Sequence, residues 1–481
     1  MEVLEVAYPD WVEKYRSKGT NISYIRGKYY LYEVSSVWNK EKGRAQKITK
    51  KYLGRVTEKD GLIPPKNKED QIKTPITVKE YGAYSVFCDI GSEIYTELKK
   101  VFPNESEEIF TLSALRVIER CPFKRAELLY DKSYFSEIYS GLKLSSKNIS
   151  MFLKKLGRNR EKLVSFMNCF IEGNEHILFD ATNIISKSDE MNINRLGYNS
   201  HRQYDPQINL LYAFTYESKM PVYYRIIPSN IREISAFKLS VTESQIKNMI
   251  IIADKGFGSQ SNFDMFDENK LKYIVPLRRN NSLFDKSTLK KGNKEAFDNY
   301  FMYNERVIWY YTNNIDSKNI IVYLDGDLKN KEEKDYICRI ESGFEGYTKE
   351  NLLEKQYDFG TIVIKTNLNK KPEDIYSLYK GRGEIEQTFD FLKNLLEQDN
   401  SYMQDKYSLE AWAFLNHISL MLSYNLYNLL HDKKLLSKYS VSDFIYHLKY
   451  IHKIKANNQW LTAEVSAKTV KLLTSLNLHI T

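Results

Sequence analysis

The sequence predicts a protein of several domains built around an α/β core, and two observations lead to that prediction. The chain has 481 residues, which is too long for one hydrophobic core and suits roughly two to four domains. Its hydrophobic periodicity changes twice, from alternation near the N-terminus to helical spacing, and then to alternating strands and helices. We therefore expect a small β-rich module, then a helical domain, and then the α/β core.

Residues 1–70 are predicted to form the β-rich module. Aromatic and basic residues alternate from residue 24 to residue 32, and glycines punctuate the pattern up to residue 56. Basic side chains beside aromatic rings suit a nucleic acid, and four of them are candidate DNA-binding residues: Arg26, Lys28, Arg44 and Lys47. A packing module with solvated lysines explains this stretch equally well. Pro64-Pro65 begins a polar linker that ends near residue 75.

Residues 75–172 are predicted to form a helical domain. Apolar residues recur there at helical spacing, as in 94–98 and 149–156. The segment from Ser145 to Asn148 has the composition of a helix start. This pattern permits a helix-turn-helix motif without singling one out.

From residue 173 the predicted elements are three strands, a helix, a strand, a helix and a strand. They lie at 177–179, 207–216, 222–227, 233–247, 249–253, 262–268 and 273–275, with a hairpin turn at 217–220. This is the order of an RNase H-like core, whose first part is 173–276. A mainly β insertion with a charged helical stretch interrupts the core at 277–358. The core resumes at 359–435, and 436–481 form a helical tail.

Three carboxylates are candidate metal ligands in this core. Asp180 and Asp254 each follow a predicted strand, and Glu386 lies on a helix that begins at Pro372. Carboxylates brought together at a sheet edge need cations to neutralise them, and oxygen ligands favour Mg²⁺ or Mn²⁺. Two such ions about 4 Å apart would serve phosphodiester cleavage or transfer. For either aspartate alone, the ordinary interpretation is a strand-ending residue that caps a turn.

A row of functional side chains is predicted on the helix that contains Glu386. The row has the spacing i, i+3, i+7 and i+14, which a 3.6-residue period places on one side: Tyr379, Arg382, Glu386 and Lys393. A guanidinium and an ammonium beside a carboxylate suit a DNA backbone that passes a metal site. For an isolated helix, a solvated face with ordinary ion pairs is the simpler interpretation. Glu384 faces away from the row because two residues rotate a helix by about 200°.

These motifs resemble those of DDE transposases from bacterial insertion sequences, in the IS4-like group and most like its IS1634 branch. The resemblance is based on Asp180-Ala181-Thr182, on Ala253-Asp254-Lys255-Gly256-Phe257, and on the helical row just described. The segments at 43–47 and 52–55 are also similar to the start of this family. The family's helix usually lacks glycines near the motif, whereas Gly381 and Gly383 flank Arg382 here.

The resemblance implies an RNase H-like fold with an inserted domain, and cut-and-paste DNA transposition with two Mg²⁺ ions, or Mn²⁺ in their place. It implies that the three carboxylates hold the metals: Asp180, Asp254 and Glu386. It also implies that three residues of the row grip phosphates near the transposon end: Tyr379, Arg382 and Lys393.

Further expectations follow from the same resemblance. Trp309, or less readily Tyr357, would stack on a base that is flipped at the cleavage site, although a core aromatic is the simpler interpretation of either residue. The protein is expected to act as a homodimer on double-stranded DNA. Its expected place is the cytoplasm of a bacterium, at the nucleoid.

The composition agrees with a DNA partner. Lys and Arg outnumber Asp and Glu by 71 to 62, and the net charge of +9 suits a polyanion without proving one. The four cysteines lie far apart, which predicts neither a zinc site nor disulfides and fits a reducing cytoplasm. The first ten residues lack the apolar segment of a signal peptide. The longest apolar stretch, 411–430, is interrupted by polar residues, so we expect a buried helix and no membrane partner.

Two other functions fit the sequence. A transposase-derived DNA-binding protein that no longer cuts would keep the basic N-terminal module. A metal-dependent nuclease without strand transfer would keep the carboxylates. All three carboxylates are present, which favours an enzyme over a binding protein.

Overall fold

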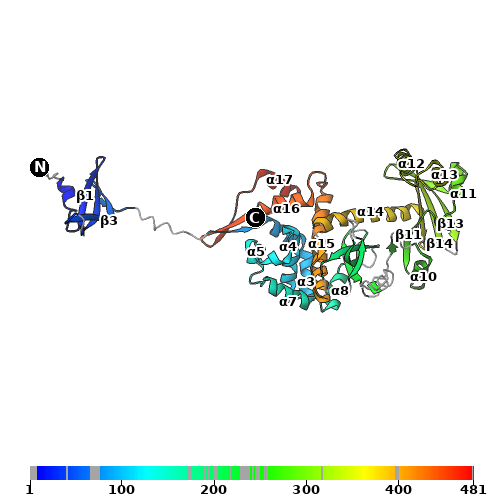
Figure 1. The fold of residues 1–481 in the computed structure, drawn as a ribbon, viewed down its shortest axis with the longest axis horizontal. Helices are drawn as coiled ribbons and strands as arrows, with labels where there is room; N and C mark the ends of the chain where they lie inside the picture. The colour runs from blue at the N-terminus through cyan, green and yellow to red at the C-terminus, as the bar shows by residue number, and fades with distance from the viewer. Residues whose placement is uncertain are drawn as a thin grey trace. The chain divides into compact units, whose positions relative to one another are not determined.

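The computed structural model describes most of the chain. The described residues are 8–39, 42–65, 76–171, 176–188, 191, 194–198, 204–216, 218–227, 239–240, 243, 250–253, 255, 258–315, 318–395, 400–478 and 480. They divide into two compact units, Met1–Pro75 and Ile76–Thr481, whose elements are labelled in Figure 1. Of the predicted elements, most of the helix at 233–247 lies outside the described residues.

The N-terminal unit is a four-stranded antiparallel sheet with a short helix. Its elements are α1 (Asp10–Glu13), β1 (Thr20–Ile25), β2 (Lys28–Asn39), β3 (Arg44–Thr57) and β4 (Gly61–Ile63), and the strand order is β1-β2-β3-β4. Val12 of α1 is buried with Ile22, Leu31 and Val56 from the first three strands. This core is small, so the unit depends on the partly buried rings around it, such as Trp11.

The second unit begins with strand β5 (Thr77–Glu80) and a layer of helices. The helices are α2 (Gly82–Ile90), α3 (Ser92–Val101), α4 (Ser106–Glu119), α5 (Ala126–Lys132), α6 (Phe135–Ile138), α7 (Ser146–Leu156) and α8 (Arg160–Asn168), with the 3₁₀ turn η2 (Phe123–Arg125) before α5. The predicted helix start at Ser145 is confirmed, because its side chain accepts a hydrogen bond from the Asn148 amide at 3.4 Å.

Helix α15 (Lys406–Asp432) joins this helical layer to the sheets. It packs against α2, α4, α7 and strand β9, and residues along most of its length are buried. The prediction of a buried helix at 411–430 is therefore confirmed. Its polar residues bond to backbone carbonyls, as Ser419 does to Ser113 at 2.8 Å and Asn425 to Ile90 at 2.8 Å. None of the described helices is long and apolar enough to cross a membrane.

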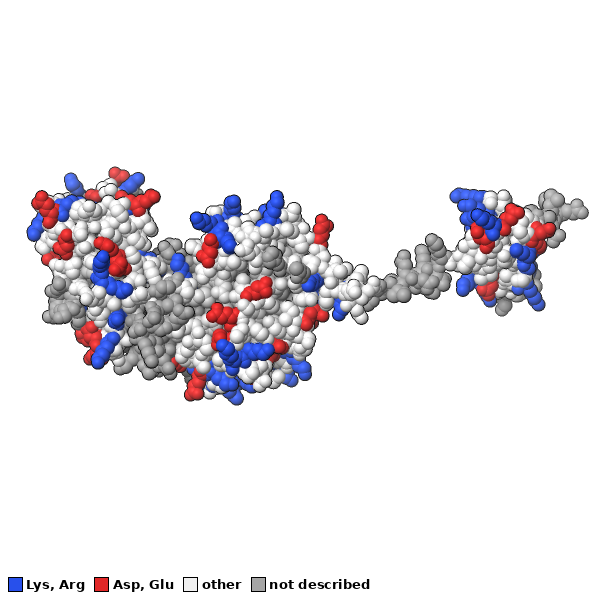
Figure 2. Space-filling view, turned by 180° about the vertical axis from the view of Figure 1, so that it is seen from behind, with Lys and Arg blue, Asp and Glu red and all other residues white. Residues whose placement is uncertain are grey.

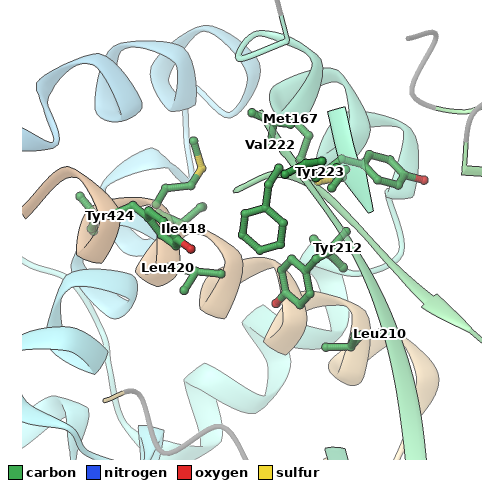
Figure 3. Packing of buried hydrophobic residues seen from close by; sticks show 14 of the residues in the cluster. Met167, Leu210, Tyr212, Val222, Tyr223, Ile418, Leu420 and Tyr424 are labelled. Atoms are coloured by element: carbon green, nitrogen blue, oxygen red, sulfur yellow. The ribbon is translucent and has the colours of Figure 1, made fainter. Parts of the chain in front are cut away.

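The contact between α15 and the first sheet is made of close-packed rings and aliphatic side chains. Figure 3 shows the Tyr212 ring of the sheet over helix α15, which also contains Ile418 and Leu420 of the same cluster. His417 is fully buried among them, with its ring 6.2 Å from that of Tyr212. Burial, followed by the charge of Arg160, lowers the His417 pKa to about 3, so this imidazole is neutral in the folded protein.

The first sheet has five strands. They are β6 (Ile177–Ser186), β7 (Arg195–Tyr198), β8 (Tyr204–Thr215), β9 (Pro221–Ile227) and β16 (Asn400–Ser401), in the order β16-β6-β8-β7, with β9 also paired to β8. The hairpin between β8 and β9 lies where the sequence predicted it.

A second sheet has six strands in the order β10-β11-β15-β14-β13-β12. They are β10 (Ile250–Ile252), β11 (Lys272–Leu277), β12 (Asn299–Tyr303), β13 (Arg306–Ile315), β14 (Lys318–Asp325) and β15 (Thr361–Thr366). The short helices α10 (Gln260–Glu268) and α11 (Ser287–Lys290) and the turn η4 (Lys294–Ala296) lie between these strands in sequence. Strand β10 pairs in parallel with β11 and also lies next to β6 of the first sheet, so the two sheets meet at this point.

The segment predicted as a mainly β insertion, 277–358, agrees with that expectation in part. The charged helical stretch is confirmed, because α12 (Gly326–Glu341) and α13 (Lys349–Lys355) follow its three strands. The difference is that those strands do not form a sheet of their own, because β14 pairs along its length with β15. The backbone N–H and C=O groups along this edge of β15 are therefore hydrogen-bonded to β14.

Two other expectations are corrected by the structure. Strand β6 does not end before Asp180 but continues to Ser186, because it pairs with β8 from Ile177 through Ile185. The C-terminal segment is not only helical. Between α16 (Val441–Lys449) and α17 (Ala467–Ser475) it forms the hairpin β17 (His452–Ala456) and β18 (Gln459–Thr462), and β17 pairs with β5 at the start of the unit.

Arg160, at the start of α8, holds three elements together. Its guanidinium bonds to Glu410 of α15 at 2.6 Å, to Glu243 at 2.9 Å and to the Tyr224 carbonyl of β9 at 2.8 Å. All of these partners are largely shielded from water, so the charge-assisted bonds are stronger than surface ion pairs. They fix the position of α15 relative to the first sheet.

Candidate active site

Helix α14 (Pro372–Leu395) contains the predicted functional row, and its 24 residues run without a break. It starts at Pro372, as predicted, with Glu373 and Asp374 in its first turn, where the helix dipole favours acids. Figure 1 shows α14 extending from the region of β13 and β14 to α15. It packs against both β10 and α15. The helix therefore connects the second sheet with the helical layer.

The first half of α14 is anchored on the strands that follow β11. The Tyr376 ring lies 4.9 Å from that of Tyr323 on β14 and 5.1 Å from that of Tyr303 on β12. The Tyr323 hydroxyl also donates to the Pro372 carbonyl at 2.8 Å. Lys380 follows this cluster, and burial, together with the nearby charge of Arg306, lowers its pKa. These contacts fix both the start and the rotation of the helix.

The middle of α14 lies close to the first sheet at Gly381. A Cβ atom at this position would overlap the ring of Tyr216, which directly follows β8. The Tyr216 hydroxyl donates to the carbonyl of Ser377 at 3.3 Å, one turn earlier. At Gly383, by contrast, a Cβ atom would meet nothing within 4 Å. The sequence singled out both glycines as departures from the family, and the structure gives a packing reason for Gly381 alone.

Two residues of the predicted row are in contact. Arg382 and Glu386 form an i,i+4 ion pair in which the arginine side chain is 12% exposed and the glutamate 36% exposed. Tyr379 is half-buried on the same helix, while the Lys393 side chain lies outside the described residues, as does that of Glu384. The ion pair agrees with the predicted row, and it is also the contact expected for an ordinary charged helix face.

The strands of the two predicted aspartates are adjacent. Asp180 lies in β6 opposite Tyr212, although its side chain is not among those described. Asp254 lies outside the described residues, but Ala253 before it bonds through its amide to the Ile274 carbonyl at 3.2 Å. Since β10 lies beside β6 and α14 packs on β10, the elements of all three carboxylates adjoin.

The donor set fits a divalent cation by its chemistry. Two aspartates and a glutamate offer oxygen atoms alone, which suit Mg²⁺ or Mn²⁺. Glu386 is partly exposed, so its carboxylate is accessible for such an ion. Within the described residues, no group of three or more His, Cys, Asp or Glu side chains could hold a metal, and Asp254 and the Asp180 side chain are not among them.

The structure separates the four candidate DNA-binding residues of the N-terminal unit into two pairs. Arg26 lies in the turn between β1 and β2, where its φ is 48°, and Lys28 begins β2. Arg44 and Lys47 lie on β3 opposite the far end of β2. Lys47 donates to the side chain of Asn21 at 2.8 Å.

Trp309 lies on β13 and is half-buried in a cluster of rings. Its ring is 5.0 Å from that of Tyr300 and 5.9 Å from that of Phe297, and the Lys294 ammonium lies 4.8 Å from its centre. The ring is thus packed in part and accessible in part. Tyr357, the weaker candidate, is also half-buried and follows α13.

A family model decides the class of this protein. The model described as the transposase DDE domain matches residues 172–422, which is more than half of the chain. The chain belongs to the DDE transposase family. The matched residues include all three candidate carboxylates, Asp180, Asp254 and Glu386.

Solved transposase structures are also similar to this DDE transposase, at low identity. The piggyBac transposase, in a synaptic complex with hairpin DNA, is 10% identical, with 77% of this chain and 79% of that chain covered and a TM-score of 0.39. The Mos1 transposase, in a paired-end complex with the left transposon end, is 11% identical, with 34% and 56% covered and a TM-score of 0.14. A comparison with curated proteins found no match.

Two structural contacts could not be found from the motif alone. Tyr216 is not part of any motif in the sequence. The sequence feature that corresponds to its contact is Gly381 in α14, which leaves room for its ring. Arg160 and Glu410 are 250 positions apart, and nothing in either local segment pairs them.

We expect Gly381→Ala to destabilise the second unit, whereas Gly383→Ala should not. The added methyl group at 381 must displace Tyr216, and overpacking of this kind costs about 1–3 kcal/mol. At 383 the alanine meets open space and should stabilise the helix by up to about 1 kcal/mol. Urea unfolding of both variants measures the difference. Equal stability of the two variants would show that the Tyr216 contact does not constrain α14.

Proposed function

We propose that this DDE transposase cleaves DNA at the ends of its own element and joins those ends to target DNA, by cut-and-paste transposition. Within the family we propose the IS4-like group and its IS1634 branch, on the motifs in 180–182, 253–257 and α14. The observation that supports this best is that α14, with Arg382 and Glu386 on one face, packs beside β10 while β10 lies next to β6.

The arrangement of strands supports an RNase H-like core. Strands β9, β8 and β6 follow one another as antiparallel neighbours, β10 lies beside β6, and β11 pairs in parallel with β10. This is the layout expected from the predicted element order, with three antiparallel strands followed by two parallel ones. The three strands β12, β13 and β14, which extend this sheet beyond β15, would then be the inserted part.

Each carboxylate has a proposed role in this core. Asp180, Asp254 and Glu386 would hold two Mg²⁺ ions, or Mn²⁺ in their place, which would activate the attacking water or 3′-hydroxyl and stabilise the leaving oxygen. Before a metal binds, Arg382 neutralises Glu386 through the ion pair. The same guanidinium would then be available to a phosphate oxygen as Glu386 turns to the cation.

Binding of DNA would involve residues of both units. We propose that Tyr379, Arg382 and Lys393 hold phosphates near the cleaved end. In the N-terminal unit the proposed contacts are Arg26, Lys28, Arg44 and Lys47. The acting species would be a homodimer on double-stranded DNA, in the bacterial cytoplasm at the nucleoid.

Incubation with DNA that carries the ends of the element, in the presence of Mg²⁺, tests the proposal. The wild-type chain should give products in which the ends are joined to target DNA. Asp180→Ala and Asp254→Ala should abolish cleavage and joining but still bind end DNA, because the metal ligands are separate from the residues that hold DNA. Asp264→Ala, at an exposed acid of α10, is the control. Binding without cutting would instead indicate a silent DNA-binding protein, and nicks without joining a nuclease.

Glu386→Gln and Glu384→Gln distinguish the third ligand. The amide at 386 keeps the shape but loses the charge that holds the cations, so cleavage should fall by about 100-fold or more. Glu384→Gln should cleave at close to the wild-type rate, because residue 384 is turned by about 200° from residue 386. Single-turnover cleavage rates measure both. If Glu384→Gln cleaved very slowly and Glu386→Gln cleaved at the normal rate, the metal would bind on the face of α14 that contains Glu384, and the proposed assignment would be wrong.

We further propose that Trp309 stacks on a base flipped at the cleavage site. Stacking on an aromatic side chain contributes about 1–3 kcal/mol per base, so Trp309→Ala should slow cleavage by roughly 5- to 150-fold. Tyr300→Ala removes a ring that packs on Trp309 and controls for a change in the cluster itself. If Trp309→Ala cleaved at the wild-type rate, the Trp309 ring would have a packing role and would not stack on a flipped base.

A further inference from the structure

The long hairpin of the N-terminal unit extends beyond the rest of its sheet. Strand β1 pairs with β2 at residues 28–33, and β4 pairs with β3 at 55–57. Beyond these points the Val34 amide still bonds to the Gly19 carbonyl at 2.7 Å, whereas in the described part of the unit the backbones of residues 35–39 of β2 and 44–48 of β3 pair with each other alone. We call these two segments, with Lys42, Gly43, Lys50 and Lys51 at their ends, the distal ribbon. A bulge between Glu33 and Val34 separates it from the sheet.

The distal ribbon exposes large apolar side chains to water, which is unfavourable unless another molecule covers them. Trp38 is 63% exposed, Val37 is 50% exposed and Ile48 is 46% exposed. An isolated pair of strands is at best marginally stable, and grouped exposed apolar residues indicate an interaction surface. The ribbon therefore has the character of an arm that contacts a partner.

The charge of the distal ribbon identifies the chemistry of that partner. Its described residues include no Asp or Glu and five basic residues: Lys42, Arg44, Lys47, Lys50 and Lys51. Among the residues that the structure describes, none of these five forms an ion pair with an acid, so their charge is available to a polyanion. Figure 2 shows Lys and Arg side chains at several places on this unit.

The register divides the ribbon into two faces. Residues directly opposite each other in an antiparallel pair lie on the same face. One face therefore has Asn39 with Arg44, Val37 with Gln46, and Ser35 with Ile48. The amide of Asn39 donates to the Gln46 side chain at 2.9 Å, which orients both groups. The other face has Trp38 with Ala45 and Ser36 with Lys47.

We propose that the distal ribbon enters the major groove of double-stranded DNA, with the Arg44 face toward the base edges. This inference depends on the proposed function, in that DNA is the substrate. Two strands about 4.8 Å apart fit a groove about 12 Å wide, which admits a β-ribbon. Arg44, Asn39 and Gln46 are the side-chain types that bond bidentately to guanine or adenine there. Val37 and Ile48 suit thymine methyl groups, and the lysines contact phosphates on either side.

The other basic pair cannot share this groove. Lys28 and Trp38 are ten residues apart on one strand, which corresponds to about 33 Å of extended chain. Arg26 and Lys28 are therefore assigned phosphate contacts at a separate place on the DNA. Only the ribbon determines which sequence is preferred.

Selection of duplexes from a randomised DNA library by the full-length chain tests this assignment. The wild-type protein should enrich a sequence motif. Arg44→Ala should lose the preference at one base pair and bind the enriched duplex about tenfold or more weakly, while Lys50→Ala should weaken all sequences alike and reduce the salt slope by about one. Arg26→Ala with Lys28→Ala should weaken binding without changing the motif. Lys59→Ala, in the turn between β3 and β4, is the control.

Replacing guanine N7 by carbon in the enriched duplex tests the groove, because this acceptor lies in the major groove alone. The wild-type protein should bind the modified duplex more weakly, and Arg44→Ala should bind both duplexes equally. The proposal is overturned if no motif is enriched, if the motif changes with Arg26 and Lys28 instead, or if the N7 replacement has no effect. Cleavage and joining of end DNA are measured separately, so failure of the transposase activity is distinguishable from failure of the ribbon.

Discussion

The close approach of Tyr216 to helix α14 at Gly381 is the contact on which the candidate site depends. Because this position has no side chain, the ring at the end of β8 lies directly against the helix. Its hydroxyl bonds to the Ser377 carbonyl and fixes the helix along its axis. Glu386 lies five residues further on, or about 7.5 Å along the axis, so its place along the helix is fixed relative to that contact. A displacement of the helix would move Glu386 relative to β10, on which the helix packs.

The remaining architecture supports this helix from both ends. At its start, tyrosines of β12 and β14 surround Tyr376, so the strands inserted between β11 and β15 position α14. At its other end α14 packs on α15, which Arg160 links to β9 and α8. The strands between β11 and β15 therefore extend the second sheet and hold the helix on which Glu386 lies.

Local features of the fold could be predicted from the sequence, and distant ones could not. The start of α14 at Pro372, the cap at Ser145 and the contact between Arg382 and Glu386 depend on residues within one or two turns. Strand β6 continues through Asp180 because β8 pairs with it, which no local pattern indicates. In the same way, β17 pairs with β5 from the other end of the unit, and Tyr216 lies 161 positions from its partner Ser377. The contact of Arg382 with Glu386 was predictable from the helical period, whereas the reason for Gly381 required the neighbouring sheet.

The central claim is that β6, β10 and α14 bring three carboxylates to one metal site. Anomalous diffraction at the manganese edge, from crystals of the full chain soaked in Mn²⁺, tests it most directly. The account predicts peaks bounded by the carboxylates of Asp180, Asp254 and Glu386, with Glu386 turned from Arg382 to the metal. Manganese bound elsewhere, or bound with Glu386 still paired to Arg382 and remote from the ion, would contradict it.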